Sequence, residues 1–246
     1  MGFFDHLEEL RGTLIKSVIA FVIFAALIGY FVKGFNHALM WPLDQVRKSY
    51  PNEDLKLGMN SIMEGFSAII TVCVMGGLAL ASPFILFFIG QFVAPALTEK
   101  EKRAVLPLCA SALILFSMGA AFGFFLLMPS TLLGSIYAGQ VFEVAFRWTL
   151  GSYYSTLAWL VLGVGGTFEF PLVIILLVWL GILTTDFLRK YRRHAIVVIF
   201  IIAAVVTPST DPFTLTVFAA PLYVLFEVAI LVSARVEKRR ALDRAA

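Results

Sequence analysis

Residues 154–180 read YSTLAWLVLGVGGTFEFPLVIILLVWL, and Glu169 is the single charged residue among them. About 20 mostly apolar residues in a helix cross the roughly 30 Å hydrocarbon core of a bilayer, so this stretch predicts a membrane span. Gly165, Gly166 and Pro171 interrupt the span near its middle. The whole chain has 246 residues, of which 60% are apolar and 14% charged, and its mean hydropathy is +0.92. This composition excludes an ordinary soluble enzyme, a disordered chain and a nucleic-acid-binding protein with a basic face.

The other apolar runs predict an all-α integral membrane protein, a single membrane domain over residues 1–246 with six transmembrane helices. We expect the fifth and sixth spans to be short. An amphipathic helix at about 4–12 precedes the first span, a tail at 234–246 follows the last, and two outer loops cover about 33–67 and 129–153. The six spans are expected at about 13–32, 68–92, 105–128, 154–180, 194–206 and 213–233.

The expected fifth span is too short for an ordinary bilayer. Thirteen residues at about 1.5 Å of rise each give roughly 20 Å, which is less than the roughly 30 Å of the hydrocarbon core. The sequence therefore predicts either a locally thinned bilayer beside this span or a shallow hairpin formed by the fifth and sixth spans.

The basic residues predict the orientation of the chain. Fourteen of the nineteen Lys and Arg residues lie in segments 1–16, 97–104, 183–193 and 234–246, which the span order places on one side of the membrane. Loops rich in Lys and Arg stay in the cytoplasm. We therefore expect both termini to be cytoplasmic, which agrees with an even number of spans.

Glu169 is the most unusual charged residue of the sequence. It follows Tyr154 by 15 residues, or about 22 Å of helix, which places it near the middle of the membrane. Carboxylates at that depth are costly and usually face a protein interior or a water-filled cavity. We interpret Glu169 as a polar site for a partner helix or a substrate. The alternative is a local hydrogen bond to a backbone carbonyl that Pro171 leaves free.

Two acidic residues near the expected cytoplasmic surface are candidates for binding an external ligand. In the segment DHLEELR at 5–11, Asp5 and Glu8 fit a capping box, which explains Glu8 and leaves Glu9 either for a ligand or for a local pair. Thr98 and Glu101 fit a second capping box, so Glu101 is either a helix cap or part of a binding site.

Three further acidic residues have structural explanations. Ser61 with Glu64 is again a capping pattern, and Asp211 before Pro212 is typical of a helix N-terminus. Glu227, inside the sixth span, either extends toward the interface or pairs with a cation.

No set of residues predicts catalysis. The histidines His6, His37 and His194 are scattered, without the spacing of metal ligands, and the chain has no phosphate-binding glycine-rich loop followed by lysine. We therefore expect no enzyme activity, no catalytic residues, no metal and no cofactor. From Glu169 alone, a proton-coupled small-solute transporter stays possible as an alternative function.

Seven segments in order resemble the TatC family, the multispanning subunit of the twin-arginine (Sec-independent) protein translocase. The resemblance covers nearly the whole chain. The segments are HLEELR at 6–11, SPFIL at 82–86, FVAPAL at 92–97 followed by EKR at 101–103, FEFP at 168–171, FLRKYR at 187–192, Thr207-Pro208 with Asp211, and Pro221-Leu222 with Phe226-Glu227.

This resemblance implies a receptor for protein export in the cytoplasmic (inner) membrane of a prokaryote. TatC proteins bind signal peptides that carry an Arg-Arg pair and pass folded proteins across the membrane, using the proton-motive force. The implied partners are these signal peptides, single-span subunits of the TatA and TatB type, further copies of the chain and the lipid bilayer, without nucleic acid.

The resemblance also assigns roles to residues of this sequence. Glu9 and Glu101, with the neighbouring Arg11 and Arg103, match the cytoplasmic positions associated with signal-peptide binding. Glu169 matches the acidic residue inside the membrane, where it contacts a partner helix. Glu64 and Asp211 match positions on the outer side.

Overall fold

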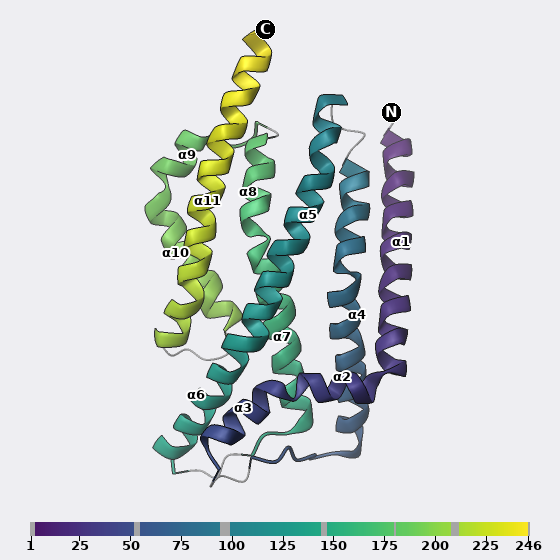
Figure 1. Cartoon of the computed structure of the whole chain (residues 1–246), viewed down its shortest axis with the longest axis vertical. Helices are drawn as coiled ribbons and strands as arrows, with labels where there is room; N and C mark the ends of the chain where they lie inside the picture. The colour runs from purple at the N-terminus through teal and green to yellow at the C-terminus, as the bar shows by residue number, and fades with distance from the viewer. Residues whose placement is uncertain are drawn as a thin grey trace.

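The structure, a computed structural model, describes residues 3–51, 55–93, 99–143, 147–179, 181–207 and 212–245 and is a bundle of helices (Figure 1). Within this described part there is no strand, which confirms the predicted all-α class. The helices are α1 (Phe3–Tyr30), α2 (Val32–Leu39), α3 (Trp41–Ser49), α4 (Ile62–Val93), α5 (Glu99–Phe122), the π-helix η2 (Gly123–Leu127), α6 (Met128–Val141), α7 (Leu150–Phe168), α8 (Phe170–Trp179), α9 (Thr185–Lys190), α10 (Arg192–Val206) and α11 (Pro212–Ala245).

Five helical stretches in the described part are long and apolar enough to cross a membrane. They are His6–Tyr30, Ile62–Phe92, Leu106–Val141, Leu150–Trp179 and Thr214–Arg235. The predicted fifth span coincides with α10, whose 15 residues give about 22 Å, still less than the roughly 30 Å hydrocarbon core.

The structure corrects three details of the expected elements. The amphipathic segment is not a separate helix, because α1 runs without interruption from Phe3 to Tyr30, and Asp5 lies inside it rather than at its N-cap. The expected outer loops contain the helices α2, α3 and α6. The helix of the sixth span is not short, because α11 has 34 residues, and its apolar part is Thr214–Arg235.

Helix α7 lies at the centre of the bundle and packs against α4, α5, η2, α6 and α10. Its contact with α5 depends on glycines. A Cβ atom at Gly119 would lie 2.8 Å from the carbonyl oxygen of Val164, and one at Gly123 would lie 2.6 Å from that of Leu160. Only glycine allows the two backbones to come this close.

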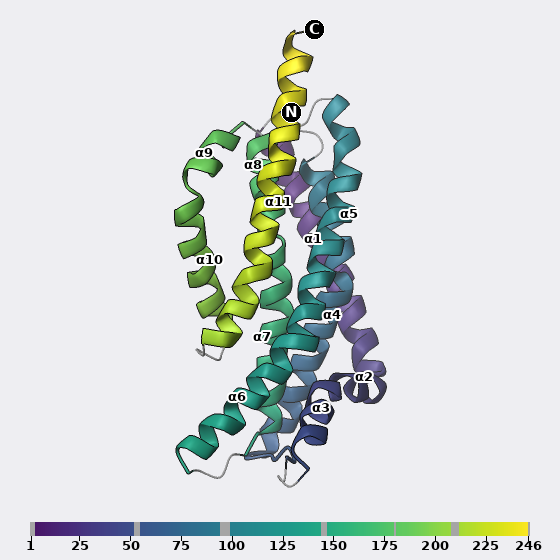
Figure 2. The same ribbon diagram turned by 60° about the vertical axis from the view of Figure 1, so that its left-hand side comes forward.

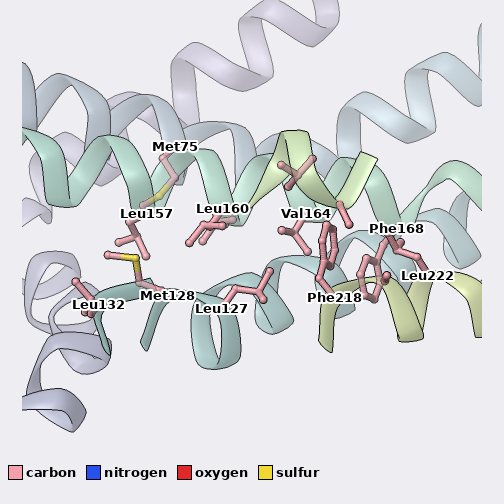
Figure 3. Packing of buried hydrophobic residues seen from close by; sticks show 14 of the residues in the cluster. Met75, Leu127, Met128, Leu132, Leu157, Leu160, Val164, Phe168, Phe218 and Leu222 are labelled. Atoms are coloured by element: carbon pink, nitrogen blue, oxygen red, sulfur yellow. The ribbon is translucent and has the colours of Figure 1, made fainter. Parts of the chain in front are cut away.

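The buried side chains of α7 form the core with those of neighbouring helices (Figure 3). Leu157, Leu160 and Val164 of α7 are fully buried, as are Leu127 and Phe218, which come from η2 and α11. Figure 3 shows these side chains in one row along α7. The core thus runs along the bundle and joins segments that are far apart in sequence.

The π-helix η2 bends the long helical stretch from α5 to α6. It begins at Gly123, which packs against the backbone of α7, and Pro129 follows in the first turn of α6. A π-helical turn and a proline each disturb the regular hydrogen bonds of an α-helix and cause bends. In Figures 1 and 2 α6 consequently leans away from the bundle.

Both chain termini lie at the same end of the bundle, as Figures 1 and 2 show. This end, which we name the terminus end, also carries the start of α5 and helix α9 (Figure 1). Helices α2, α3 and α6 lie toward the other end, which we name the outer end.

We expect Gly123→Ala to lower the free energy of unfolding by about 1–3 kcal/mol, because the added methyl group would press on the backbone of α7. Thermal and SDS-induced unfolding in detergent would measure the change. Gly134→Ala is the matched control, since Gly134 lies in the same apolar stretch with no atom within 4 Å of its Cβ position. Equal stability of the two variants would contradict this account of the α5–α7 contact.

Candidate functional site

Glu9 lies on the second turn of α1, at the terminus end. Its side chain is 33% exposed, and its Oε2 atom is 3.9 Å from Nδ1 of His6, one turn earlier. The His6 ring stacks on Phe92 in the last turn of α4, with ring centroids 4.5 Å apart and an angle of 18° between the planes. Arg11 is exposed on the same helix. The start of α1 and the end of α4 are therefore in direct contact beside Glu9.

Glu101 and Arg103 lie in the first turns of α5. Their backbone is described and helical, whereas their side chains lie outside the described part of the structure. Helix α4 packs against both α1 and α5, and the starts of α1 and α5 lie at the same end of the bundle (Figure 1). The fold thus places the segments of Glu9 and Glu101 at one end, on two of the helices that pack against α4.

Glu169 lies at the break between α7 and α8, about midway along the bundle (Figure 1). Its backbone N–H donates to the carbonyl of Gly166 over 3.1 Å, and its own carbonyl accepts from Leu172 and Val173. Pro171 has no N–H with which to continue the regular helix. The regular helix is therefore broken at Glu169.

The Glu169 carboxylate is half-buried. Across the residues that the structure describes, it has no hydrogen bond or ion pair, so the alternative of a local bond to a freed carbonyl is not present in the structure. The neighbouring Phe168 is buried and packs near Phe122 of α5, with ring centroids 5.8 Å apart. Glu169 therefore has a fixed backbone and an unpaired side chain.

Glu64 joins two helices at the outer end. Its Oε2 atom accepts a hydrogen bond from the N–H of Asn60 over 2.6 Å, and its Oε1 atom accepts one from Gly151 in the first turn of α7 over 2.9 Å. Ser61 completes the cap of α4, since its hydroxyl accepts from the N–H of Met63. An anionic side chain is favourable at both helix N-termini. The capping interpretation of Glu64 is thus confirmed and extends to a second helix.

The second predicted outer position, Asp211, lies outside the described residues. At the last described residues before this gap, the indole N–H of Trp159 donates to the carbonyl of Val206 over 2.8 Å and attaches the end of α10 to α7.

Two polar contacts near the terminus end could not be assigned from the sequence. Arg192 Nη2 lies 3.0 Å from Glu227 Oε2, and the Tyr223 hydroxyl donates to Glu227 Oε1 over 3.0 Å. Glu227 therefore pairs with a cation, one of the two outcomes left open above. A second acidic residue of α11, Glu237, accepts hydrogen bonds from the N–H and the hydroxyl of Thr185, at the start of α9. The Arg192–Glu227 and Thr185–Glu237 contacts join segments distant in sequence, so spacing gives no signal for them, whereas Tyr223 and Glu227 lie four residues apart on α11.

A cavity of about 470 Å³ opens at the outer end between α2, α4 and α7. Its lining is largely apolar, with Lys33, Asn36 and Tyr154 as the polar members, and it includes none of the predicted site residues. In the described part of the chain, no group of three or more His, Cys, Asp or Glu residues could hold a metal ion.

Comparison with known proteins gives consistent matches. Residues 5–221 match the family "TatC: Sec-independent protein translocase protein (TatC)". The chain is 35% identical over 227 residues to the Sec-independent protein translocase protein TatC of Aquifex aeolicus, covering 92% of each chain. It is 34% identical over 228 residues to that of Escherichia coli K12, covering 93% of this chain and 86% of the relative.

Solved structures agree with the sequence matches. A structure described as "Crystal Structure of Twin Arginine Translocase Receptor- TatC" superimposes with a TM-score of 0.76 at 33% identity, covering 94% of this chain and 99% of the other. A second, in the detergent DDM, gives the same TM-score at 34% identity, covering 93% and 99%.

We expect Glu64→Gln to destabilise the outer end, because the amide places an NH₂ group against one of the two backbone N–H donors. A fall of a few degrees in the apparent melting temperature would show this. Glu143→Gln is the matched control, since Glu143 is an exposed glutamate of the connection that leads toward α7. An unchanged melting temperature in the Glu64 variant would mean that its two hydrogen bonds do not stabilise the fold.

Proposed function

The chain belongs to the TatC family of Sec-independent protein translocase proteins, and from this we propose that it is the receptor subunit that binds Arg-Arg signal peptides. It is a multispanning membrane component of the twin-arginine translocase, and its relatives are named for transport rather than for a catalytic reaction. Membership of this family does not favour the small-solute transporter.

The partly exposed carboxylate of Glu9 is the observation that carries this proposal. At 3.9 Å from the His6 nitrogen, its oxygens are beyond hydrogen-bond distance of their neighbour and can accept bonds from a ligand. A guanidinium binds a carboxylate through two parallel hydrogen bonds, which the ammonium of lysine cannot reproduce. Glu9 and Glu101, on two helices that pack against α4, are suited to one arginine each.

The net charge of the terminus end is positive, so recognition of a cationic peptide there depends on individual acidic side chains. Basic residues outnumber acidic ones in segments 1–16, 97–104, 183–193 and 234–246, so the net field does not attract a cationic peptide. Selectivity then depends on the individual carboxylates. Arg11 and Arg103 flank these carboxylates in sequence.

The same proposal places the terminus end in the cytoplasm of a prokaryote, with the chain in the inner membrane, because most Lys and Arg residues lie in the segments of this end. The apolar part of the signal peptide then lies along the spans. Single-span subunits of the TatA and TatB type and further copies of the chain assemble around it. The proton-motive force drives the passage of the folded cargo.

Glu169 is the proposed contact for a single-span partner. Its carboxylate is half-buried, unpaired in the described structure and held by a fixed helix break. A polar side chain on a partner helix would give this carboxylate the hydrogen bond that lipid cannot.

The receptor proposal makes a prediction about signal-peptide binding. In nanodiscs, Glu9→Ala and Glu101→Ala should each weaken binding of a fluorescent Arg-Arg peptide by about 10-fold or more, the usual scale for losing a charged hydrogen-bonding partner. The same peptide with Lys-Lys should bind the wild-type protein more weakly. Fluorescence anisotropy measures both effects.

Glu8→Ala serves as the matched control, because Glu8 is the exposed neighbour of Glu9 on α1. It should leave the affinity unchanged. Equal affinity of the wild-type protein for Arg-Arg and Lys-Lys peptides would refute the receptor proposal and leave the two glutamates as ordinary surface or capping residues.

The proposed role of Glu169 makes a prediction about the contact with a single-span partner. Glu169→Ala should reduce photo-cross-linking and copurification of a single-span partner several-fold, and Glu169→Gln should retain part of both if a hydrogen bond is the main contact. Thr167→Val is the control, because the Thr167 hydroxyl already donates to the carbonyl of Gly163 over 2.7 Å within the helix. Cross-linking that is unchanged in Glu169→Ala would exclude this role.

A further inference from the structure

The cavity at the outer end has the depth of one membrane leaflet. Its volume of about 470 Å³ lies within the roughly 300–1,000 Å³ of ordinary ligand sites. Along α4 its lining extends from Ile62 to Val72, ten residues further along the chain. At about 1.5 Å of rise per residue this length is roughly 15 Å, which is half of the roughly 30 Å hydrocarbon core.

The cavity lies where three apolar stretches reach the outer end. His6–Tyr30 ends just before the lining residue Val32, and Ile62–Phe92 and Leu150–Trp179 both begin with residues of the lining. Helix α2 crosses α4 here and packs against it (Figure 1). The cavity therefore extends from the level of the lipid headgroups into the hydrocarbon core.

The polar groups of the lining offer hydrogen-bond donors. The hydroxyl of Tyr154 donates to Oδ1 of Asn36, which leaves the NH₂ group of Asn36 without an acceptor among the described residues. Lys33 is exposed and, in the described part of the chain, has no hydrogen bond or ion pair. Because Lys33 and Asn36 lie three residues apart on α2, their side chains share one face of the helix. Together they fit an anionic group such as a phosphate.

No carboxylate among the described residues lines the cavity. Glu64 is adjacent in sequence to the lining residue Gly65, but both of its carboxylate oxygens already accept hydrogen bonds, from Asn60 and Gly151. The described lining therefore carries the positive charge of Lys33 without an acidic side chain to balance it.

The rest of the lining is apolar and partly open to the surface. Ala68 and Val72 are buried, whereas Ile62, Phe66 and Ile69 are 84%, 61% and 49% exposed. Exposed apolar residues that adjoin one another mark a surface that contacts a membrane or an apolar ligand.

We propose that this cavity binds one anionic phospholipid of the leaflet at the outer end, with its phosphate at Lys33 and Asn36 and an acyl chain along the first turns of α4. An amphiphile of this kind matches a lining that is one leaflet deep and apolar, with a cation at the membrane boundary. A membrane-spanning helix of a partner would need a groove about twice as deep. A small soluble anion would gain nothing from the apolar residues.

A lipid in this position would attach the outer end of α1 to the bundle. In the apolar window of His6–Tyr30 only 6% of the residues are buried, the lowest share among the five apolar stretches. Helix α2 follows α1 directly, so a ligand held between α2, α4 and α7 restrains both. Because it binds the folded state, such a ligand raises the stability of the protein.

The test is thermal unfolding of delipidated protein in detergent with added lipid, combined with native mass spectrometry, which counts the bound lipids. Phosphatidylglycerol should raise the apparent melting temperature by a few degrees, and phosphatidylcholine with the same chains should raise it less. Lys33→Ala should weaken phosphatidylglycerol binding about 5-fold, the scale for one lysine near an anionic lipid. Asn36→Asp retains an oxygen for Tyr154 but places a carboxylate against the phosphate, so it should remove the preference for phosphatidylglycerol.

Two matched controls separate the site from general effects. Lys48→Ala removes an exposed lysine of the outer end that does not line the cavity, and it should leave lipid binding unchanged. Gly65→Leu should narrow the cavity and weaken the binding of both lipids, since a Cβ atom at Gly65 would meet Sδ of Met59 at an ordinary contact distance of 3.5 Å. Gly134→Leu is its control, because no atom lies within 4 Å of the Cβ position there.

Three results would overturn the proposal. The first is equal stabilisation by the two lipids, or a phosphatidylglycerol effect that persists in Lys33→Ala, because the phosphate would then not be bound at Lys33. The second is a shift of the same size with inorganic phosphate, which would make the site one for a free anion. The third is a wild-type protein that retains no phosphatidylglycerol, which would leave the cavity to an apolar segment of a partner protein. The proposed function is tested separately, because this assay contains no signal peptide.

Discussion

The close approach of α5 and α7 is the constraint on which the rest of the bundle depends. Gly119 and Gly123 bring α5 against the carbonyl groups of Val164 and Leu160. In a membrane the hydrophobic effect does not hold helices together, so close van der Waals packing at small residues takes its place. With α5 fixed on one side, α7 can receive α4, η2 and α10 on others. The fully buried side chains consequently lie along α7.

Helix α7 ends directly before Glu169, the proposed polar site inside the membrane. Pro171 prevents regular hydrogen bonding through this turn, and α7 ends at Phe168. The buried Phe168 anchors one side of the break against α5, while Glu169 beside it has an unpaired carboxylate in the described structure. The Glu169 carboxylate, which would be costly in lipid, thus lies directly beside a well-packed residue of the core.

The two ends of the bundle are built differently. At the outer end, Glu64 binds the first turn of α7, the Tyr153 hydroxyl donates to the carbonyl of Leu39, and that of Tyr154 donates to Asn36. Near the terminus end, the described contacts are separate: the His6–Phe92 stack, the Arg192–Glu227 pair and the Thr185–Glu237 hydrogen bonds. The described polar contacts of the outer end thus join α2, α4 and α7 to one another, whereas those near the terminus end each join a single pair of helices.

The sequence by itself determined the membrane class, the apolar stretches, the short α10 and the family, because these depend on composition, local order and motifs that tertiary contacts do not alter. It also identified Glu9, Glu64 and Glu169 as unusual carboxylates. Tertiary structure alone decided that Glu64 joins α4 to α7, that Glu227 pairs with Arg192 and that His6 reaches Phe92. It also decided that the segments of 33–67 and 129–153 contain helices. These outcomes depend on which residues distant in sequence meet, and spacing along the chain carries no information about such contacts.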